Sequence, residues 1–254
     1  MQPPEVDNLI TNIDQAYDAF ADEVSRIILS ITTGGTVQFT TENLNAIAQA
    51  YPNFVSRLRG LGMDSFKADL FASEARTITA FKKFKVDGFV PFKLSAAKDI
   101  PLIKSLQASE LLEVLALEQE TANAVYNTLV SSVTQGQQSY DAIKSLEKAV
   151  ETQKRYTKTW YNTSRQIYEQ KLQDLSAKNY QDEFGGDLFW EYIGAPKDDK
   201  IRYECSMAVD KMVFTNAEKE AFESGQMFDA GVPRYNCRHT FWQITERRYR
   251  EMTQ

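Results

Sequence analysis

Apolar residues recur every three or four positions through most of residues 1–180, which is the pattern of amphipathic helices. The Gly pair at 34–35 ends the first helix, and Thr40 or Thr41 is a suitable cap for a shorter helix that ends near Pro52. The inward face of the first helix is predicted to consist of Leu9, Ile13, Ala16, Phe20, Val24, Ile27 and Ile31.

Three more helices are predicted after the first two. One lies between residues 64 and 85, and an irregular connection rich in Gly and Pro follows at 86–101. The next helix has a strong apolar stripe, and the segment TQGQQ at 134–138 separates it from the last in a helical hairpin. The stripe consists of Leu111, Val114, Leu115, Ala122, Val125, Tyr126, Leu129 and Val133.

The last of these helices is unusually long, because neither Gly nor Pro interrupts residues 140–177. At 1.5 Å per residue it would extend about 55 Å, so its apolar face needs neighbours or another subunit along that length. Its predicted inward residues are Ile143, Leu146, Val150, Tyr156, Trp160, Ile167, Leu172 and Leu175.

The pattern changes near Tyr180, where EFGGDLFWEYIGAPKDDK brings several Gly and Pro residues between short apolar runs. LFWEYIG and HTFWQIT are typical of strands, and Thr215 to Ser224 of a short capped helix. We therefore predict a mainly α protein: an elongated helical arm or bundle over 1–180, then a small α+β module over 181–254.

Composition narrows the class of protein. Of 254 residues, 29 are basic and 35 acidic, so the net charge of -6 gives no overall attraction for nucleic acid or an anionic membrane. The start of the chain lacks the charged and apolar regions of a signal peptide, and no run of about 18 apolar residues occurs. We therefore expect no membrane contact. No cofactor is predicted.

The rarest residues with side-chain chemistry are the two cysteines, Cys205 and Cys237, and the one histidine, His239. A structural zinc site needs four ligands, and these three would require a carboxylate or another subunit as the fourth. A disulfide would close a loop of about 31 residues but is disfavoured in a reducing cytosol. The third alternative is two buried thiols between strands.

Nucleophilic catalysis would need a cysteine within hydrogen-bonding reach of His239. Cys237 lies two residues away on the same predicted strand, which leaves their backbones about 7 Å apart, whereas Cys205 remains geometrically open. The basic run RRYR supplies Arg247, Arg248 and Arg250 as candidate contacts for DNA phosphates, or as a solvated, salt-bridging helix face.

Three segments taken together, YIGAPKDDKIRYEC, the spacer at 208–231 and VPRYNCRHTFWQI, resemble the C-terminal module of the phage Mu F-like minor head proteins. The residues that carry the resemblance occur in the family's order across roughly 186–245. They are Asp199, Arg202, Cys205, Lys211, Pro233, Asn236, Cys237, Arg238 and His239. The chain departs from the family in lacking further Cys or His near Cys205, so no metal site is predicted.

The resemblance implies a minor head protein of a tailed phage. Such a protein would be synthesised in the host cytoplasm and located in the virion, at the portal vertex or head interior, for head assembly, DNA packaging or genome delivery. Its partners would be the portal protein and other head proteins, with several copies in a larger assembly. In this setting Asn236, Arg238 and His239 would hold the last strand by hydrogen bonds, without a catalytic role.

Two alternatives belong to other functional classes. One is an effector or nuclease-like module on a helical delivery arm, with His239 as general acid or base and Arg202 or Arg238 on a phosphate. The other is an accessory protein that binds the packaged DNA end through Arg247, Arg248 and Arg250, a non-specific contact that salt would weaken.

Overall fold

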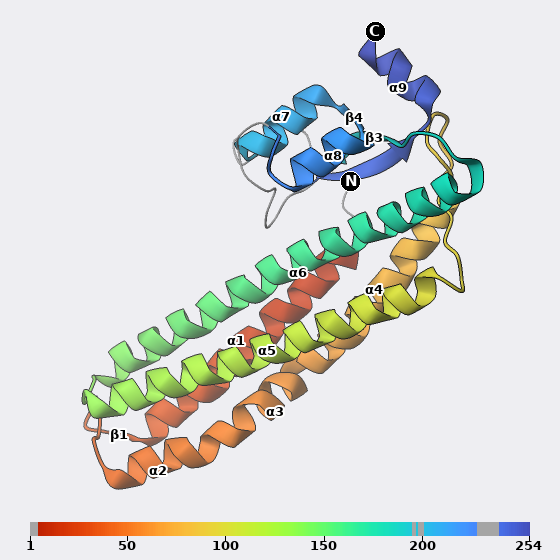
Figure 1. Ribbon diagram of the computed structural model, residues 1–254. Coiled ribbons are helices and arrows are strands. Elements are labelled where there is room, and N and C mark those ends of the chain that lie inside the picture. Colours follow the sequence, from red (N-terminus) through yellow and green to blue (C-terminus); the bar gives the residue numbers. More distant parts are fainter. Residues whose placement is uncertain (1–4, 195–196, 198–200, 228–238) are drawn as a thin grey trace. The chain divides into compact units, whose positions relative to one another are not determined.

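The computed structural model describes residues 5–194, 197, 201–227 and 239–254. The chain is mainly α-helical with a small C-terminal α+β region, as predicted (Figure 1). Its described residues form two compact units, a bundle unit of 5–72 and 108–158 and a sheet unit of 73–107 and 159–254. The boundaries between these units lie inside the long helices α4, α5 and α6. The predicted division of the chain into two domains at residue 180 stays a prediction.

The N-terminal helices largely match the prediction. Helix α1 spans Glu5–Ser30 and α2 spans Thr41–Ala50, where the Thr40 hydroxyl caps the helix by accepting from the backbone N–H of Asn43. A 3₁₀ turn at Tyr51–Asn53, α3 at Phe54–Leu58 and a π turn at Arg59–Met63 then lead into α4, Asp64–Lys83. These short intermediate elements were not predicted.

Helices α1 and α5 bury most of their predicted stripes. Helix α5 spans Asp99–Thr134, so the irregular connection ends before Asp99 and the prediction was wrong for 99–101, which are helical. On α1 Ile28 is buried where Ile27 was predicted to be, and Ile27 is half-buried. The stripe residues that are buried are Leu9, Ile13, Ala16, Phe20 and Val24 on α1, Ile31 directly after α1, and Val114, Ala122, Val125, Leu129 and Val133 on α5.

Helix α6, Ser139–Phe184, is longer than predicted and its inward face is more polar. Gly185, in a left-handed conformation with φ of 71°, ends it. Tyr156 and Ile167 were predicted inward, but both are more than half exposed. The buried positions that replace them are Thr157, Tyr161, Ser164 and Tyr168, which have the helical spacing that the apolar residues lack.

A hydroxyl cluster in the bundle unit explains why a threonine lies inward. The Tyr17 hydroxyl on α1 is 2.6 Å from the Thr157 hydroxyl on α6 and 3.1 Å from that of Thr121 on α5. All three side chains are buried, and this burial raises the pKa of Tyr17 despite the two hydrogen bonds. Because each hydroxyl has a partner, the helices bury these polar groups at little cost.

A short hairpin closes one end of the bundle unit. Strands β1, Thr32–Thr33, and β2, Thr36–Val37, pair across Gly34 and Gly35, both at positive φ, as a two-residue turn requires. The prediction that the Gly pair ends the first helix was wrong, because α1 ends at Ser30 and the pair instead forms the turn of the hairpin.

Two cations, one in the π turn and one on α4, lie beside one buried carboxylate. Arg59 Nε lies 2.6 Å and Lys67 Nζ 2.9 Å from the carboxylate of Glu118 on α5, whose side chain is fully buried. Gly62, at φ 145°, lies against α1, since a Cβ there would be 3.1 Å from the Cβ of Ala16. A buried carboxylate is stable here because two cations offset its lost hydration.

We expect Glu118→Gln to destabilise the protein by about 2 kcal/mol, because it leaves Arg59 and Lys67 facing a neutral group. Urea unfolding at neutral pH measures this loss. Glu120→Gln, at an exposed position on the same helix, is the matched control and should change stability by less than about 0.5 kcal/mol. Equal effects of the two variants would contradict a structural role for the Glu118 pairs.

The sheet unit contains an antiparallel sheet in the order β4-β3-β5, formed by Val213–Thr215, Phe189–Gly194 and His239–Ile244. Both predicted strands are present, as is the predicted short helix, α8 at Asn216–Glu223. The elements not predicted as such are β4, α7 at Tyr203–Lys211 and α9 at Glu246–Thr253. The sheet core consists of Ala177, Leu188, Trp190, Tyr192, Ala208, Phe214, Phe222 and Phe241.

Candidate functional site

The described part of the chain includes only some of the predicted site residues. Arg202, Cys205 and His239 are described, as are the three arginines of α9. The others lie outside the described residues, namely Asp199, Pro233, Asn236, Cys237 and Arg238. The pairing of Cys205 with Cys237 therefore stays a prediction.

Tyr192 brings Cys205 and His239 together. On β3, Trp190 and Tyr192 point into the core because alternate residues of a strand share a face. The His239 ring stacks on the Tyr192 ring, with centroids 5.1 Å apart and planes at 16°. The Tyr192 hydroxyl donates to Cys205 Sγ at 3.6 Å. Tyr192 thus contacts two motif residues that are distant in the sequence, a role that its place in an alternating strand could have indicated.

Cys205 lies on a helix, which corrects the prediction that it packs between strands. Arg202, in an extended conformation and exposed, precedes α7 at the N-cap position. Cys205 and Ala208 are then three residues apart on one face of α7, and both are buried. The short run from Tyr203 to Lys211 has too little apolar periodicity to reveal this helix from the sequence alone.

His239 is almost fully buried at the start of β5. Its backbone carbonyl accepts from the Gln166 amide of α6 at 3.4 Å. A ring that is stacked and enclosed in this way has little surface for a substrate, so its geometry suits a structural brace better than a general acid or base.

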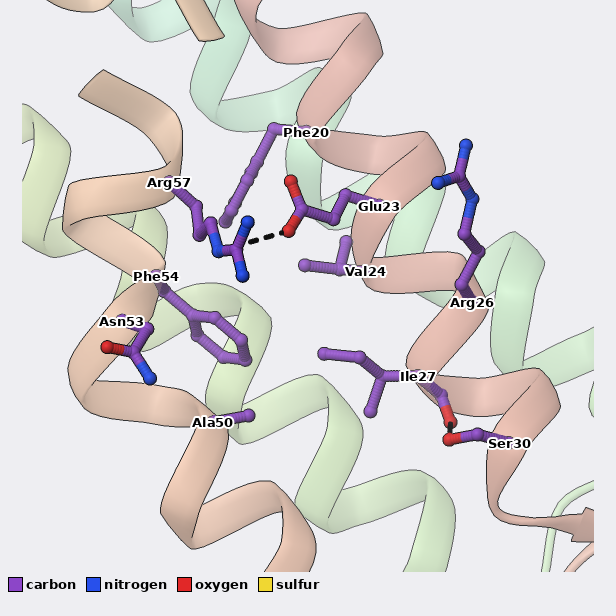
Figure 2. A pocket seen from close by; sticks show the side chains of 10 residues that line it. All are labelled: Phe20, Glu23, Val24, Arg26, Ile27, Ser30, Ala50, Asn53, Phe54 and Arg57. Carbon is purple, nitrogen blue, oxygen red and sulfur yellow. Dashed lines mark hydrogen bonds and ion pairs between the residues drawn. The ribbon is translucent and has the colours of Figure 1, made fainter. Parts of the chain in front are cut away.

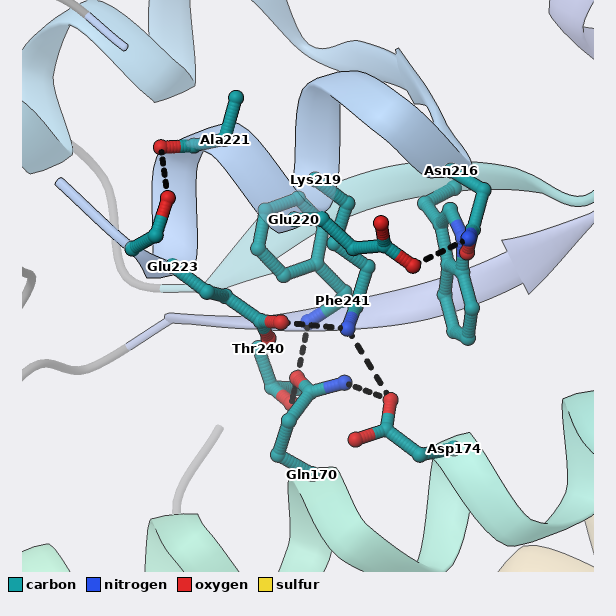
Figure 3. Close-up of polar contacts among 11 residues, drawn as sticks. Gln170, Asp174, Asn216, Lys219, Glu220, Ala221, Glu223, Thr240 and Phe241 are labelled. Carbon is teal, nitrogen blue, oxygen red and sulfur yellow. Dashed lines mark hydrogen bonds and ion pairs between the residues drawn. The ribbon is translucent and has the colours of Figure 1, made fainter. Parts of the chain in front are cut away.

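A buried lysine links α8 to α6, and its role was not predicted from the sequence. Lys219 Nζ lies 3.1 Å from the Asp174 carboxylate on α6 and 2.9 Å from Glu223 one turn along α8 (Figure 3). It also lies over the rings of Trp190 and Phe241, 4.8 and 5.5 Å from their centroids. The signal in the sequence is its spacing of three from the buried Phe222, which places both on one helix face.

Gln170 of α6 caps the outer edge of β5. Its side-chain oxygen accepts from the backbone N–H of Phe241 and from the Thr240 hydroxyl, both at 2.9 Å (Figure 3). Further along the same edge, the N–H of Val90 donates to the carbonyl of Gln243 at 3.0 Å. These contacts satisfy backbone groups that an edge strand would otherwise offer to another chain.

The basic run RRYR lies on α9, and each of its arginines has a carboxylate partner. Arg248 binds Glu191 through Nε at 2.6 Å and through a second nitrogen at 3.1 Å, and this hydrogen bonding raises its pKa. Arg247 binds Asp87 at 2.7 Å, and Arg250 binds Glu246. The geometry fits the salt-bridging alternative, and DNA contact by these residues stays a prediction.

Arg248 is held on its other side by the connection after α4. Its guanidinium lies 4.6 Å from the centroid of the Phe89 ring, and its side chain packs so closely on Gly88 that a Cβ there would be 2.8 Å from Arg248 Cδ. Arg248 therefore has a structural role in joining the sheet to this connection.

The bundle unit carries a small groove between α1 and the α2–α3 segment, with a volume of about 410 Å³ (Figure 2). Phe20, Val24 and Phe54 line its apolar side, and Arg57 pairs with Glu23 at 3.3 Å near its edge. The three apolar side chains are almost completely buried, so the groove offers a ligand little apolar surface.

The described residues contain neither a metal-binding cluster nor a membrane-spanning helix. No three His, Cys, Asp or Glu side chains among them converge in a way that could hold a metal ion. None of the helices in that part of the chain has the length and apolar character needed to cross a membrane. Comparison with protein-family models, curated proteins and solved structures finds no match to this chain.

Helix α8 begins with the predicted cap, whose contribution to the stability of the fold depends on pH. Thr215 and Glu218 bond each other's backbone N–H groups in a capping box, and Glu218 also pairs with Lys211 at 2.8 Å. Partial burial alone would raise the pKa of Glu218, but the bonds from Lys211 and Thr215 outweigh it and lower the pKa. The carboxylate therefore stabilises the fold above its unfolded pKa of about 4.3, and this contribution is lost as the pH falls through the lowered pKa.

We expect Glu218→Gln to cost about 0.5 kcal/mol at neutral pH, a small effect because solvent still reaches the carboxylate and screens its ion pair. The difference from the wild type should vanish in acid, where Glu218 is protonated. Urea unfolding at several pH values measures this, with the exposed Glu147→Gln as control. A difference that persists below the lowered pKa would contradict the electrostatic account.

Proposed function

We propose that the protein is a minor head protein of a tailed phage, located at the portal vertex or in the head interior. The observation that carries the proposal is the ordered motif from Asp199 to His239, with its resemblance to the Mu F-like module. The geometry supports it because Cys205 and His239, two of the motif residues that the structure describes, pack around Tyr192 in the sheet core. A motif that maintains a core is expected in a structural protein.

The role that we propose is assembly rather than catalysis. The portal protein and other head proteins would be the partners, and head assembly, DNA packaging or genome delivery the process. The long helices supply extended surfaces for such partners, since α6 alone spans 46 residues and exposes Tyr156 and Ile167. Contact with the packaged DNA would be secondary to these protein contacts.

The location of the chain in a phage particle tests this proposal. We expect purified particles of the phage that encodes the chain to contain it in a small, fixed number of copies per portal, measured by quantitative mass spectrometry. Deleting its gene should yield heads that lack DNA or fail to deliver it. Particles that assemble and infect without the chain would exclude the proposal.

Substitution of His239 separates this role from the nuclease-like alternative. Because His239 is a core residue, His239→Ala should lower the free energy of unfolding by about 2 kcal/mol. His239→Phe should lower it by less, because a second aromatic ring preserves the stack on Tyr192. Urea unfolding measures both, with Arg250→Ala on the surface as control. If His239→Ala kept full stability and instead abolished cleavage of nucleic acid, His239 would be catalytic.

A further inference from the structure

Three large apolar side chains are exposed at one end of the bundle unit. Leu29 near the end of α1 is 57% exposed, Phe39 before α2 is 66% exposed and Tyr140 at the start of α6 is 72% exposed. In Figure 1 the hairpin, the start of α2 and the turn between α5 and α6 lie together at this end. We call the surface formed by Leu29, Phe39 and Tyr140 the end surface.

Backbone hydrogen bonds hold the segments of the end surface together. The N–H of Gln38, next to Phe39, donates to the carbonyl of Ile31, two residues after Leu29, at 3.3 Å. The N–H of Ser139, next to Tyr140, donates to the carbonyl of Gly35 in the hairpin at 2.8 Å. The three apolar side chains are therefore carried on a connected framework, which lowers the entropy cost of binding a partner.

The segments that build the end surface contain no charged residue. None occurs between Arg26 and Glu42, nor between Glu120 and Asp141, although a quarter of the whole chain is charged. Depletion of charge together with exposed aromatic side chains is the composition of the centre of a protein–protein interface.

Exposed charges of both signs lie next to these uncharged segments in the sequence, and we call Arg26, Glu42, Asp141 and Lys144 the rim. Arg26 lies three residues before Leu29 and Lys144 four residues after Tyr140, positions that share a helix face with them. Glu42 and Asp141 are the nearest acids. All four are exposed, and none forms an ion pair with another residue that the structure describes; in Figure 2 no dashed line joins Arg26 to the other residues drawn. The rim thus offers two cations and two anions to another molecule.

We propose that the end surface is where two copies of this chain associate. A two-fold contact places the same surface on both sides, so an apolar centre meets an apolar centre and a rim with both signs can pair with itself. Elsewhere a net charge of -6 on each copy opposes approach, and the neutral end surface avoids this repulsion. The acids Glu42 and Asp141 disfavour an anionic membrane as the occupant. The proposal does not depend on the head function.

Charges placed in the centre of the end surface should abolish the association. We expect the full wild-type chain to approach twice its monomer mass as concentration rises through the micromolar range in sedimentation velocity. Phe39→Glu with Tyr140→Glu should weaken self-association at least about tenfold. Leu112→Glu, at an equally exposed apolar position on α5 of the same unit, is the matched control and should associate like the wild type. Circular dichroism checks that all variants keep their helices.

Reversing the rim charges gives a sharper test. A variant with Arg26→Glu and Lys144→Glu has only acids on the rim, and one with Glu42→Lys and Asp141→Lys has only bases. Each alone should self-associate more weakly than the wild type, and an equal mixture should restore the association, more strongly at low salt. Restoration would distinguish paired rims from unspecific apolar adhesion.

Three outcomes would overturn the proposal. The first is a wild-type chain that stays monomeric at every concentration. The second is association that the Phe39 and Tyr140 substitutions leave unchanged. The third is a monomer that binds neutral or anionic phospholipid vesicles through Phe39 and Tyr140, which would make a membrane the occupant. None of these measurements uses phage particles. A result that overturns the association of two copies would therefore leave the proposed head function untouched.

Discussion

The stability of α6 is the constraint on which the rest of the structure depends. A helix of 46 residues is stable only if neighbours cover its inward face, and this face is not a continuous apolar stripe. It is apolar at Leu146, Val150 and Leu172 but polar at Thr157 and Ser164. Specific hydrogen bonds therefore decide which residues of α6 face inward, because a buried hydroxyl without a partner would cost more than the helix gains from burial.

Both compact units use α6 in this way. In the bundle unit its Thr157 hydroxyl bonds Tyr17 of α1. In the sheet unit its Gln170 caps the edge of β5 and its Asp174 binds the buried Lys219 of α8. These polar contacts are directional, so they fix the register of each packed element more narrowly than apolar contacts do. The small sheet is thereby attached to a helix at defined points.

The residues of the proposed phage motif fit this organisation. Cys205 and His239 meet at Tyr192, inside the sheet core. Arg248, which is not part of the motif, joins the sheet to the connection after α4 through Glu191 and Phe89. Surface contacts with partners would then fall to other parts of the chain, such as the exposed aromatic residues of the bundle unit. We propose that the motif maintains the sheet unit and that the bundle unit presents the surfaces for assembly.

Local sequence patterns by themselves determined the long helices and the caps at Thr40 and Thr215, because these depend on neighbours within about four residues. The stripe from Leu9 to Ile31 and the capping pair of Thr215 and Glu218 are examples. The tertiary structure alone decided the helical position of Cys205, the exposure of Tyr156 and the burial of Lys219. Each of these depends on a partner far away in the sequence, such as Tyr192, Tyr17 or Asp174, and no periodicity within one segment encodes such a partner.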